Sequence, residues 1–534
     1  MWLATVCMGA SLAQAQLPAV PGVSEFDWRF SIKANSTASS NIEARNICRK
    51  PQRFEIVMQG LPSFVRVLGE PGLLVAPGTA NQVPVKFDST GLSAGLHEGK
   101  VVVRCVTCRT EPTCTTDHQV LHIFMTVEPQ VLAEFVPGRV LVTVPLDSAE
   151  DAKTAANRLS TTFGMKVEEV TPLNSANIAL IVFSLPEGVD VLKKVAELGS
   201  KSVTAQPDYL YSANGDSAKS DSASGDSASS DAASSAAEQA VNPPAQLQYG
   251  PRLIGVDSLH GIVTGKGVKV ALIDTGVDAA HPALAGKIVE RNDVTGKGFT
   301  ADVHGTLLAG IIAGEPKDGA GIAGIAPGAE ILAIKACQPQ TPQAAAAQCW
   351  SRTLARGLDL AIEKKAAVIN MSLGGPGGVE DKLLKRMVDE AVGRGAFLVA
   401  AAGNDGAKAK PGFPAALPNV VAVTAVDSKD QLYPSATQGD FVALSAPGVE
   451  IVSTSPGGKL LVSSGTSLAT AFVSGTAALA LQQQPRLTPQ SLKALLERTA
   501  QDLGPAGKDP QFGSGLVNAC RAVAELKHDP KLCR

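Results

Sequence analysis

The chain has 534 residues, 45% of them hydrophobic and 18% charged, which are ordinary values for a globular protein and exclude disorder over the full length. Its 47 Lys and Arg residues against 50 Asp and Glu leave a net charge of -3, which excludes a strong field for nucleic acid or an anionic membrane. The length predicts roughly three or four domains, and the absence of any apolar run of about 18 residues argues against a transmembrane helix.

The first residues predict the compartment. Residues 2–13 are apolar or small and are followed by Ala13-Gln14-Ala15, a small-x-small pattern. This pattern predicts a secretory signal peptide over residues 1–15 and therefore a secreted protein, extracellular or periplasmic. The basic residues usual before such a stretch are missing, and a buried N-terminal segment is the alternative.

Cysteine usage agrees with an oxidising compartment, because eight cysteines remain in two groups of four once Cys7 is removed with the signal. In the second group the local pairs Cys337–Cys349 and Cys520–Cys533 are the favoured disulfides. In the first group three pairings are open, and a zinc site at Cys105-x-x-Cys108 with Cys114 is the alternative. That first group consists of Cys48, Cys105, Cys108 and Cys114.

Residues 16–130 are predicted to form an N-terminal all-β domain. Short runs such as LLVAP, VPVKFD, GKVVVRCV and LHIFMTV are rich in strand-forming residues and are separated by Gly, Pro, Ser and Asn. The pattern is typical of an antiparallel sandwich and resembles bacterial immunoglobulin-like modules. No residue in this segment is predicted to be catalytic.

Residues 131–214 change in pattern to strand, helix, two strands, helix and strand, the ferredoxin-like α+β order. The first helix is expected to open at Asp147-Ser148-Ala149-Glu150, with Glu150 completing a capping box. Many unrelated domains share this order, so alone it does not indicate a function. Residues 215–247 follow as a predicted disordered linker, rich in Ser, Ala and Asp.

Residues 248–534 form the largest predicted unit. Apolar strands such as VKVALID, AVIN, FLVAA and VVAVTAV alternate with helical stretches, which predicts an α/β fold, a parallel sheet with helices on both faces. Asp274 closes the first strand, Asn404 follows FLVAA, and His304 and Ser467 each open an apolar helix. Because such folds carry their sites at the carboxyl ends of the strands, these four residues are the catalytic candidates.

These stretches resemble the subtilases, the subtilisin-like serine proteases. The resemblance rests on ALIDTGVDAAHP, HGTLLAGIIAG, INMSLGGP, AAGND, GFPA and SSGTSLATAFVSG, which occur in the family's order. It implies a subtilisin-like fold and a secreted endopeptidase that cleaves protein or peptide substrates through an acyl-enzyme, with no cofactor needed for the chemistry. Ser467 is then the expected nucleophile, His304 the general base, and Asp274 the carboxylate that orients His304.

The resemblance also implies roles around the triad. Asn404 matches the side-chain donor of the oxyanion hole. The segment Ser372, Leu373 and Gly374 matches the edge strand that pairs with substrate. Gly412 matches the floor of the main specificity pocket, so that an open pocket and cleavage after large apolar residues are expected.

Some positions depart from the family's pattern. Leu468 follows the nucleophile where Met is usual, which predicts that the activity resists peroxide. Ala471 and Phe472 are expected to reshape the side of the site that holds the leaving group. A structural calcium is common in the family, but its usual loop is altered here and Asp318 is the sole candidate ligand, so no calcium residue is assigned.

Residues 131–214 stand where a subtilase carries its propeptide. The resemblance therefore implies an inhibitor and folding chaperone whose last strand lies in the substrate groove, with self-cleavage near Asn214 or within the linker. A constitutive ferredoxin-like module is the alternative. Two other functions stay open: a catalytically weak surface or binding protein that acts through residues 16–130, and a non-proteolytic hydrolase such as an esterase. The context G-T-S-L-A around Ser467 is not the G-x-S-x-G elbow of α/β-hydrolases, which argues against the esterase.

Overall fold

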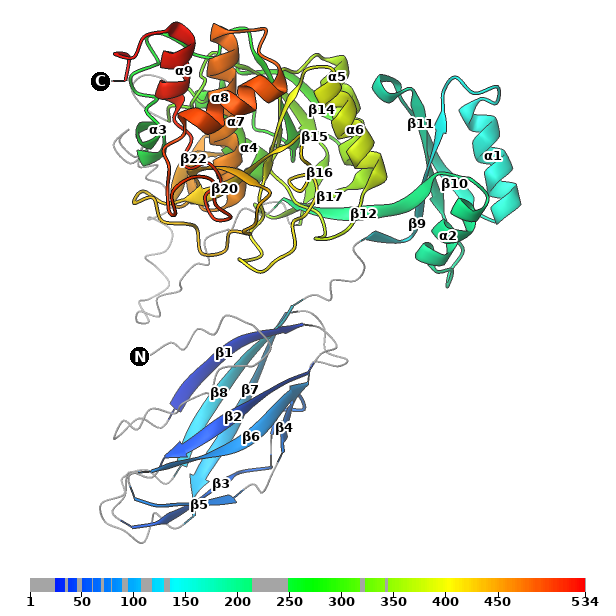
Figure 1. Cartoon of the computed structure of the whole chain (residues 1–534). Coiled ribbons are helices and arrows are strands. Elements are labelled where there is room, and N and C mark those ends of the chain that lie inside the picture. The colour runs from blue at the N-terminus through cyan, green and yellow to red at the C-terminus, as the bar shows by residue number, and fades with distance from the viewer. Residues whose placement is uncertain are drawn as a thin grey trace. The chain divides into compact units, whose positions relative to one another are not determined.

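The computed structural model describes residues 25–33, 37–45, 50–59, 61–68, 72–77, 79–88, 95–106, 118–128, 135–213, 248–316, 322–340 and 344–533. The predicted signal peptide, the linker and Asn214 lie outside these ranges. The chain divides into two compact units, Met1–Leu132 and Ala133–Arg534, and each is described by itself (Figure 1). Within the described ranges, no helix is long and apolar enough to span a membrane.

The first unit consists of β-strands in two sheets. Alternate residues are buried along its strands, as in Val83, Val85 and Phe87, which is the two-residue period expected when one face of a strand points inward. One sheet has the order β1 (Glu25–Lys33), β8 (His118–Glu128), β7 (Gly95–Cys105), β3 (Gln52–Ile56) and β5 (Gly72–Val75). The other has the order β2 (Thr37–Arg45), β6 (Ala80–Asp88) and β4 (Val65–Val67).

The second unit begins with four strands of a six-stranded antiparallel sheet, whose order is β10, β11, β9, β12, β17 (Ala347–Trp350) and β16 (Cys337–Pro339). Two helices complete the βαββαβ arrangement and pack on a separate small core that includes Val142, Leu159, Phe183 and Leu198. The elements are β9 (Phe135–Pro145), α1 (Ala152–Phe163), β10 (Lys166–Leu173), the short η2 (Asn174–Ala176), β11 (Ile178–Ser184), α2 (Val191–Ser200) and β12 (Ala205–Ala213).

The expected start of the first helix is wrong. Helix α1 begins at Ala152, and its N-cap is Asp151, whose carboxylate accepts hydrogen bonds from the backbone N–H groups of Lys153 and Thr154. Glu150 does not reach back to form a capping box; it pairs with Arg158 at 2.9 Å. The carboxylate nearer to the helical residues therefore caps the helix.

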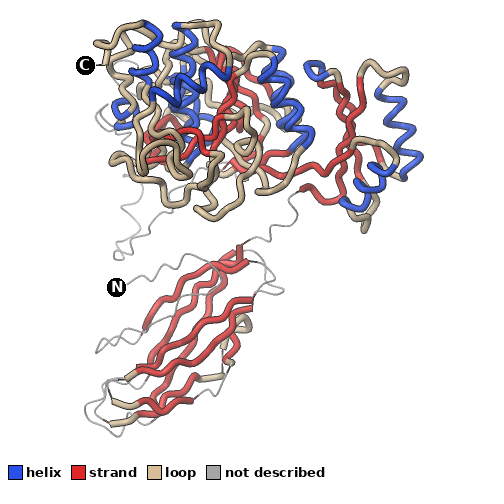
Figure 2. The backbone as a smooth tube through the Cα atoms, in the orientation of Figure 1, coloured by secondary structure: helices blue, strands red, loops and turns tan. Residues whose placement is uncertain are grey.

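The rest of the second unit is built on a seven-stranded sheet in which all neighbouring strands are parallel. Along β13, Val270 and Leu272 belong to one hydrophobic core, and Ala271 and Ile273 belong to the other, so both faces of the sheet are covered (Figure 2). The strand order is β14 (Ile288–Asp293), β15 (Glu330–Lys335), β13 (Lys269–Asp274), β18 (Val368–Met371), β19 (Phe397–Ala401), β20 (Val421–Val426) and β21 (Val442–Pro447).

Helices lie on both faces of this sheet. The first core includes residues of α3 (Tyr249–Leu253), α4 (Val303–Ala313), α7 (Thr466–Gln483), α8 (Pro489–Thr499) and α9 (Ala519–Lys527). The second core includes residues of α5 (Ser351–Glu363) and α6 (Lys382–Gly393). Smaller elements are η4 (Pro282–Leu284) and the hairpin of β22 (Ile451–Ser455) and β23 (Lys459–Ser463). Chain order diverges on the two sides of β13, which makes the end of β13 the switch point where ligands bind in open α/β sheets.

Two predicted disulfides are present. Cys337–Cys349 joins β16 (Cys337–Pro339) to β17 (Ala347–Trp350), and Cys520–Cys533 ties α9 to the C-terminal residues. Cys105 is also disulfide-bonded, which argues against its use as a zinc ligand. The other cysteines of its group lie outside the described residues, so the pairing there stays open.

Candidate active site

Asp274 and His304 meet at the end of β13. The Asp274 side chain is fully buried, and its Oδ1 accepts a hydrogen bond from the backbone N–H of Thr275 at 2.7 Å. His304 is buried in the first turn of α4, with Nδ1 2.7 Å from the same oxygen. Because a carboxylate accepts and does not donate, Nδ1 carries the proton and Nε2 is the nitrogen left to act as a base.

The contact between the end of β13 and the start of α4 admits only glycine at two positions, one on each side. A Cβ on Gly276 would meet the carbonyl oxygen of Thr300 at 1.8 Å, and a Cβ on Gly305 would meet the carbonyl oxygen of Gly276 at 2.7 Å. These close approaches press the start of α4 against the end of β13. The glycines of Asp-Thr-Gly and His-Gly-Thr are therefore what bring the carboxylate and the imidazole into contact.

A buried ion pair that the sequence analysis missed fixes the same helix end. Asp302, the N-cap residue of α4, accepts a hydrogen bond from Gly276 N–H at 2.9 Å and pairs with Lys335, which is 1% exposed. Lys335 also donates to Thr300 Oγ1 at 2.7 Å. The available signal was a lone cation at the end of the apolar strand EILAIK, since a lysine there needs a buried partner.

Ser467 lies in the first turn of α7, where the helix dipole favours developing negative charge. Gly465 precedes the helix with φ of 152°, a conformation that favours glycine. The Ser467 hydroxyl donates to the carbonyl of Ser372 at 3.2 Å, and the Ser372 hydroxyl donates to the carbonyl of Ser467 at 2.8 Å. This reciprocal pair ties the start of α7 to the segment that follows β18.

The second ring nitrogen of His304, Nε2, is the one that would accept a proton from the nucleophile. His304 Nε2 is buried and has no hydrogen-bond partner in the described part of the chain. The nucleophile–base hydrogen bond is thus not formed in this conformation, in which Ser467 Oγ is directed to Ser372. Catalytic hydrogen bonds are often absent or long until substrate binds, so this geometry is compatible with catalysis.

Asn404 follows β19 and is oriented by Thr466, a residue that the sequence analysis missed. Asn404 Oδ1 accepts from Thr466 N–H at 3.0 Å and from Thr466 Oγ1 at 2.9 Å, and Thr466 Oγ1 accepts from Gly403 N–H at 3.3 Å. The amide oxygen is therefore committed to α7, and any donor role falls to Asn404 Nδ2. The sequence shows Thr466 directly before Ser467, but it does not indicate that Thr466 contacts Asn404.

The Ser372–Gly374 segment pairs with strand β12. Ser212 N–H donates to Gly374 O at 2.8 Å, and Gly374 N–H donates to Ser212 O at 3.0 Å, an antiparallel bridge. On its other edge β12 pairs with β17, with Tyr211 opposite Cys349. Strand β12 thus lies between two edges contributed by residues 248–533. Gly412 lies against the neighbouring backbone, where a Cβ would meet Gly375 O at 2.4 Å; its role as a pocket floor stays a prediction.

Residues 135–213 also bind the N-terminal ends of α5 and α6. Asp208 is fully buried and accepts from Arg352 N–H at 3.2 Å and Arg352 Nη1 at 2.6 Å, at the start of α5. At the start of α6, Gln206 Oε1 accepts from Leu383 N–H at 2.8 Å, and Gln206 Nε2 donates to Asp381 at 2.7 Å. Asp208 and Gln206, both from residues 135–213, therefore accept hydrogen bonds from backbone N–H groups at the starts of α5 and α6.

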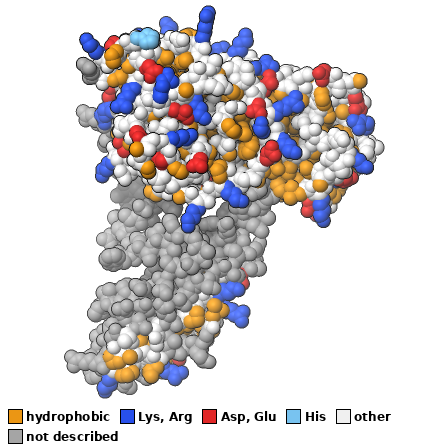
Figure 3. All heavy atoms as spheres, viewed as in Figure 1, with side chains coloured by type: hydrophobic (Ala, Val, Ile, Leu, Met, Phe, Trp, Pro, Cys, Tyr) orange, Lys and Arg blue, Asp and Glu red, His pale blue; other side chains and the backbone are white. Residues whose placement is uncertain are grey.

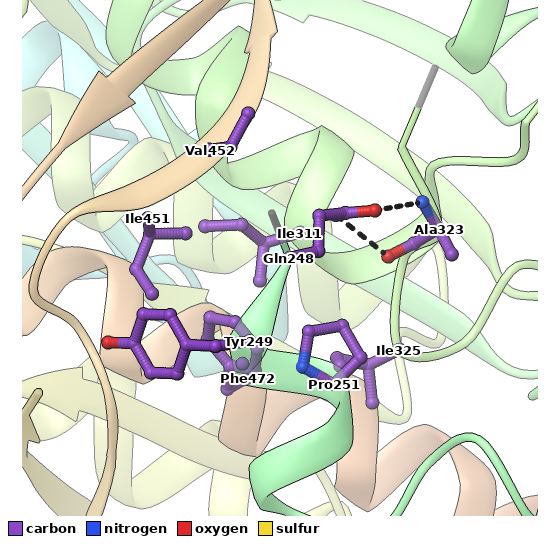
Figure 4. A pocket seen from close by; sticks show the side chains of 10 residues that line it. Gln248, Tyr249, Pro251, Ile311, Ala323, Ile325, Ile451, Val452 and Phe472 are labelled. Atoms are coloured by element: carbon purple, nitrogen blue, oxygen red, sulfur yellow. Dashed lines mark hydrogen bonds between the residues drawn. The ribbon is translucent and has the colours of Figure 1, made fainter. Parts of the chain in front are cut away.

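A hollow lies under α3, against the hydrophobic core (Figure 4). Tyr249 lines it and donates its hydroxyl to Val449 O at 2.6 Å, and burial raises the pKa of that phenol. Phe472 is 2% exposed and lines the same hollow, so its ring packs beneath α3 and does not face the leaving-group side as the sequence analysis expected.

The charged side chains of the described residues were compared with the arrangements that bind metal ions. Figure 3 shows acidic and basic side chains interspersed over the visible face of the larger unit. Among the residues that the structure describes, no group of three or more His, Cys, Asp and Glu is arranged to hold a metal ion. Asp318 lies outside them, so a structural calcium stays a prediction.

Comparison with known proteins identifies the family of the larger unit. The model of the Subtilase family matches residues 265–515. Thermitase from Thermoactinomyces vulgaris is 38% identical over 279 residues, covering 52% of this chain and 95% of that protein. Subtilisin E from Bacillus subtilis is 38% identical over 281 residues, covering 52% of this chain and 71% of that protein.

A solved structure is similar over a larger part of the chain. The crystal structure of fervidolysin from Fervidobacterium pennivorans, a keratinolytic enzyme related to subtilisin, has a TM-score of 0.57 and 25% identity, covering 73% of this chain and 61% of that chain. Its likeness supports the subtilisin-like α/β fold with a parallel sheet. The chain therefore belongs to the subtilase family and is a subtilisin-like serine endopeptidase.

Proposed function

We propose that Asp274, His304 and Ser467 are the catalytic triad. The observation that carries this is the buried 2.7 Å contact between Asp274 Oδ1 and His304 Nδ1 at the switch point of the sheet. Ser467 Oγ attacks the scissile carbonyl while His304 Nε2 takes its proton. His304 then returns that proton to the leaving amine, and the acyl-enzyme is hydrolysed by a water that His304 deprotonates. Asp274 stabilises the imidazolium throughout.

Asn404 Nδ2 and the Ser467 backbone N–H are the proposed oxyanion donors. The hold of Thr466 on Asn404 Oδ1 supports this, because it directs the amide nitrogen away from the helix. A preoriented donor needs no reorganisation when negative charge develops on the carbonyl oxygen. Thr466 is thus a positioning residue that acts through Asn404.

Residues 131–214 are proposed to be an inhibitory propeptide, and the chain a self-processed zymogen. Two observations support this. Strand β12 pairs with β17 on one edge and with Gly374 on the other, two residues from the Ser372 that is hydrogen-bonded to Ser467. Asp208 and Gln206 bind the starts of α5 and α6. A strand held in this way excludes other peptides from the groove. Cleavage is proposed near Asn214 or within residues 215–247.

Secretion is part of the same proposal. The signal-like start and the two disulfides of the larger unit support an extracellular or periplasmic protein, because disulfides persist in oxidising compartments. Peptide bonds of unfolded or extended proteins are the proposed substrates.

The test compares the wild-type chain with Ser467→Ala by mass spectrometry. The wild type is expected to shorten, with a new N-terminus between residues 209 and 247, whereas Ser467→Ala stays full length. Thr476→Val is the matched control, since the Thr476 hydroxyl lies on the same helix and bonds to Phe472 O at 2.9 Å. A mature N-terminus before Tyr209 would contradict the propeptide assignment, and processing of Ser467→Ala would contradict the nucleophile.

A further inference from the structure

Tyr211 is the most deeply buried large side chain of β12. It is 1% exposed, although it is proposed to leave with the propeptide. Its ring lies over Gly375, where an added Cβ would meet the ring at 2.5 Å, so that glycine makes room for an aromatic side chain. The residues around it belong to the segment that follows β18, to β17 and to the starts of α5 and α6. The cavity that Tyr211 fills therefore remains with the enzyme after maturation.

The inner end of this cavity is polar. The Tyr211 hydroxyl donates to Asp381 Oδ2 at 2.8 Å, and the Ser351 hydroxyl donates to the same oxygen. Asp381 Oδ1 accepts from Leu384 N–H at 2.9 Å, which makes Asp381 the N-cap of α6. With β12 in place Asp381 is 1% exposed, and Gln206 Nε2 of the same segment also donates to its Oδ1 at 2.7 Å. The cap on Leu384 N–H belongs to the enzyme itself and fixes the carboxylate at the end of the cavity.

The chemistry of this contact favours a phenol over a plain ring. Burial and the neighbouring Asp381 raise the pKa of Tyr211 well above its usual value, so the phenol keeps its proton and donates it. A phenylalanine in the same place would leave Oδ2 without one of its two hydroxyl donors. Sites built to hydrogen-bond a substrate hydroxyl discriminate strongly against the analogue that lacks it.

We propose that Asp381 is a specificity-determining residue that makes this cavity a subsite for tyrosine in substrates. The inference rests on the proposed function, in which β12 lies in the groove as substrate does. Cleavage is proposed near Asn214 or within the linker, and when the bond directly after Asn214 is taken as the cleaved one, Tyr211 is the fourth residue before it. Proteins with tyrosine at that position are therefore the preferred substrates, beyond those with other large apolar residues.

The test uses active enzyme obtained by expressing the full chain. Three quenched fluorescent peptides carry Tyr, Phe or Leu at the fourth position before one cleaved bond and are otherwise identical, and mass spectrometry verifies that the same bond is cut. The wild type is expected to cleave the Tyr peptide with a kcat/KM about tenfold or more above the Phe peptide. Asp381→Ser, which keeps a helix-capping oxygen but shortens the side chain, is expected to bring that ratio close to one.

Ser351→Ala is the matched variant, because it alters the same cavity but leaves Asp381 Oδ2 as acceptor. Its Tyr to Phe ratio is expected to stay at the wild-type level. Should Asp381→Ser fail to fold, Asp381→Asn keeps the cap and is expected to lower the ratio through loss of charge. Equal cleavage of the Tyr and Phe peptides by the wild type, or a ratio unchanged in the Asp381 variants, overturns this inference alone. Cleavage of no peptide by the wild type overturns the proposed function as well.

Discussion

Replacing Thr466 by Val tests how the proposed oxyanion donor is held in place. Val has nearly the same shape as Thr but lacks the hydroxyl that donates to Asn404 Oδ1 at 2.9 Å, while the backbone N–H at 3.0 Å still donates. One of two hydrogen bonds to the amide is lost, which corresponds to about 1 kcal/mol and a fall in kcat of roughly fivefold to tenfold. Asn404→Ala removes the donor itself, and the expected loss is about 10²- to 10³-fold.

The assay measures kcat and KM separately on one peptide substrate. Because the donor acts on charge that develops only in the transition state, kcat is expected to fall while KM stays nearly constant. In the double variant, Thr466→Val is expected to add nothing to Asn404→Ala, since Thr466 acts through Asn404.

The matched control is Thr470→Val, one turn further along α7. Thr470 is also buried, and its hydroxyl donates to Thr466 O at 2.8 Å without contact to Asn404. Both Val variants lose a buried hydroxyl, and Thr466→Val is expected to lose more thermal stability because it also removes the acceptor of Gly403 N–H. Thr470→Val should lose some stability but keep kcat. A normal kcat in Thr466→Val, or full additivity with Asn404→Ala, would refute the positioning role.

Three further predictions concern the propeptide, the tyrosine subsite and oxidation. Arg352→Ala removes the closer ion-pair partner of the buried Asp208 and leaves Arg139 at 3.6 Å. The docking of residues 135–213 should therefore weaken by about 3 kcal/mol, and protease activity should appear sooner after synthesis. An unchanged delay before activity appears contradicts this. The phenol bound at Asp381 has a raised pKa, so it binds in its protonated form. The preference for the Tyr over the Phe peptide should therefore be full below the ordinary Tyr pKa of about 10 and be lost above it, where the free peptide loses its phenolic proton. A Tyr to Phe ratio of kcat/KM that stays constant to about pH 11 counts against the Asp381 contact. Leu468 is fully buried beside Ser467 and has no thioether, so peroxide should inactivate Leu468→Met much faster than the wild type; equal rates would remove the reason for the predicted resistance.

The sequence was most informative where one short motif carries both a backbone requirement and a chemical group. Asp274-Thr275-Gly276 is an example, because the glycine needed for the close approach to Thr300 stands beside the carboxylate. The alternation of apolar strands and helices predicted the parallel sheet for the same kind of reason. The two local disulfides of the larger unit followed from short spacing alone.

What the sequence could not predict depends on partners that are far apart in the chain. Gln206 and Leu383 are separated by 177 residues, and Tyr211 and Asp381 by 170, so no local pattern relates them. Thr466 and Asn404 are separated by 62 residues. The error at α1 had a different cause, since two neighbouring carboxylates were candidate caps and only the backbone geometry selects Asp151. Phe472 was assigned to the leaving-group side because helix position alone does not reveal which core a side chain enters.

The central claim is that His304 and Asp274 activate Ser467 as the nucleophile. The most direct measurement is to treat the active enzyme with a serine-directed fluorophosphonate and locate the adduct by peptide mass spectrometry. The account predicts one adduct on Ser467, with activity lost in step with labelling, and no labelling in His304→Ala because the base is missing. An adduct on another residue, or proteolysis that persists in Ser467→Ala, would contradict it.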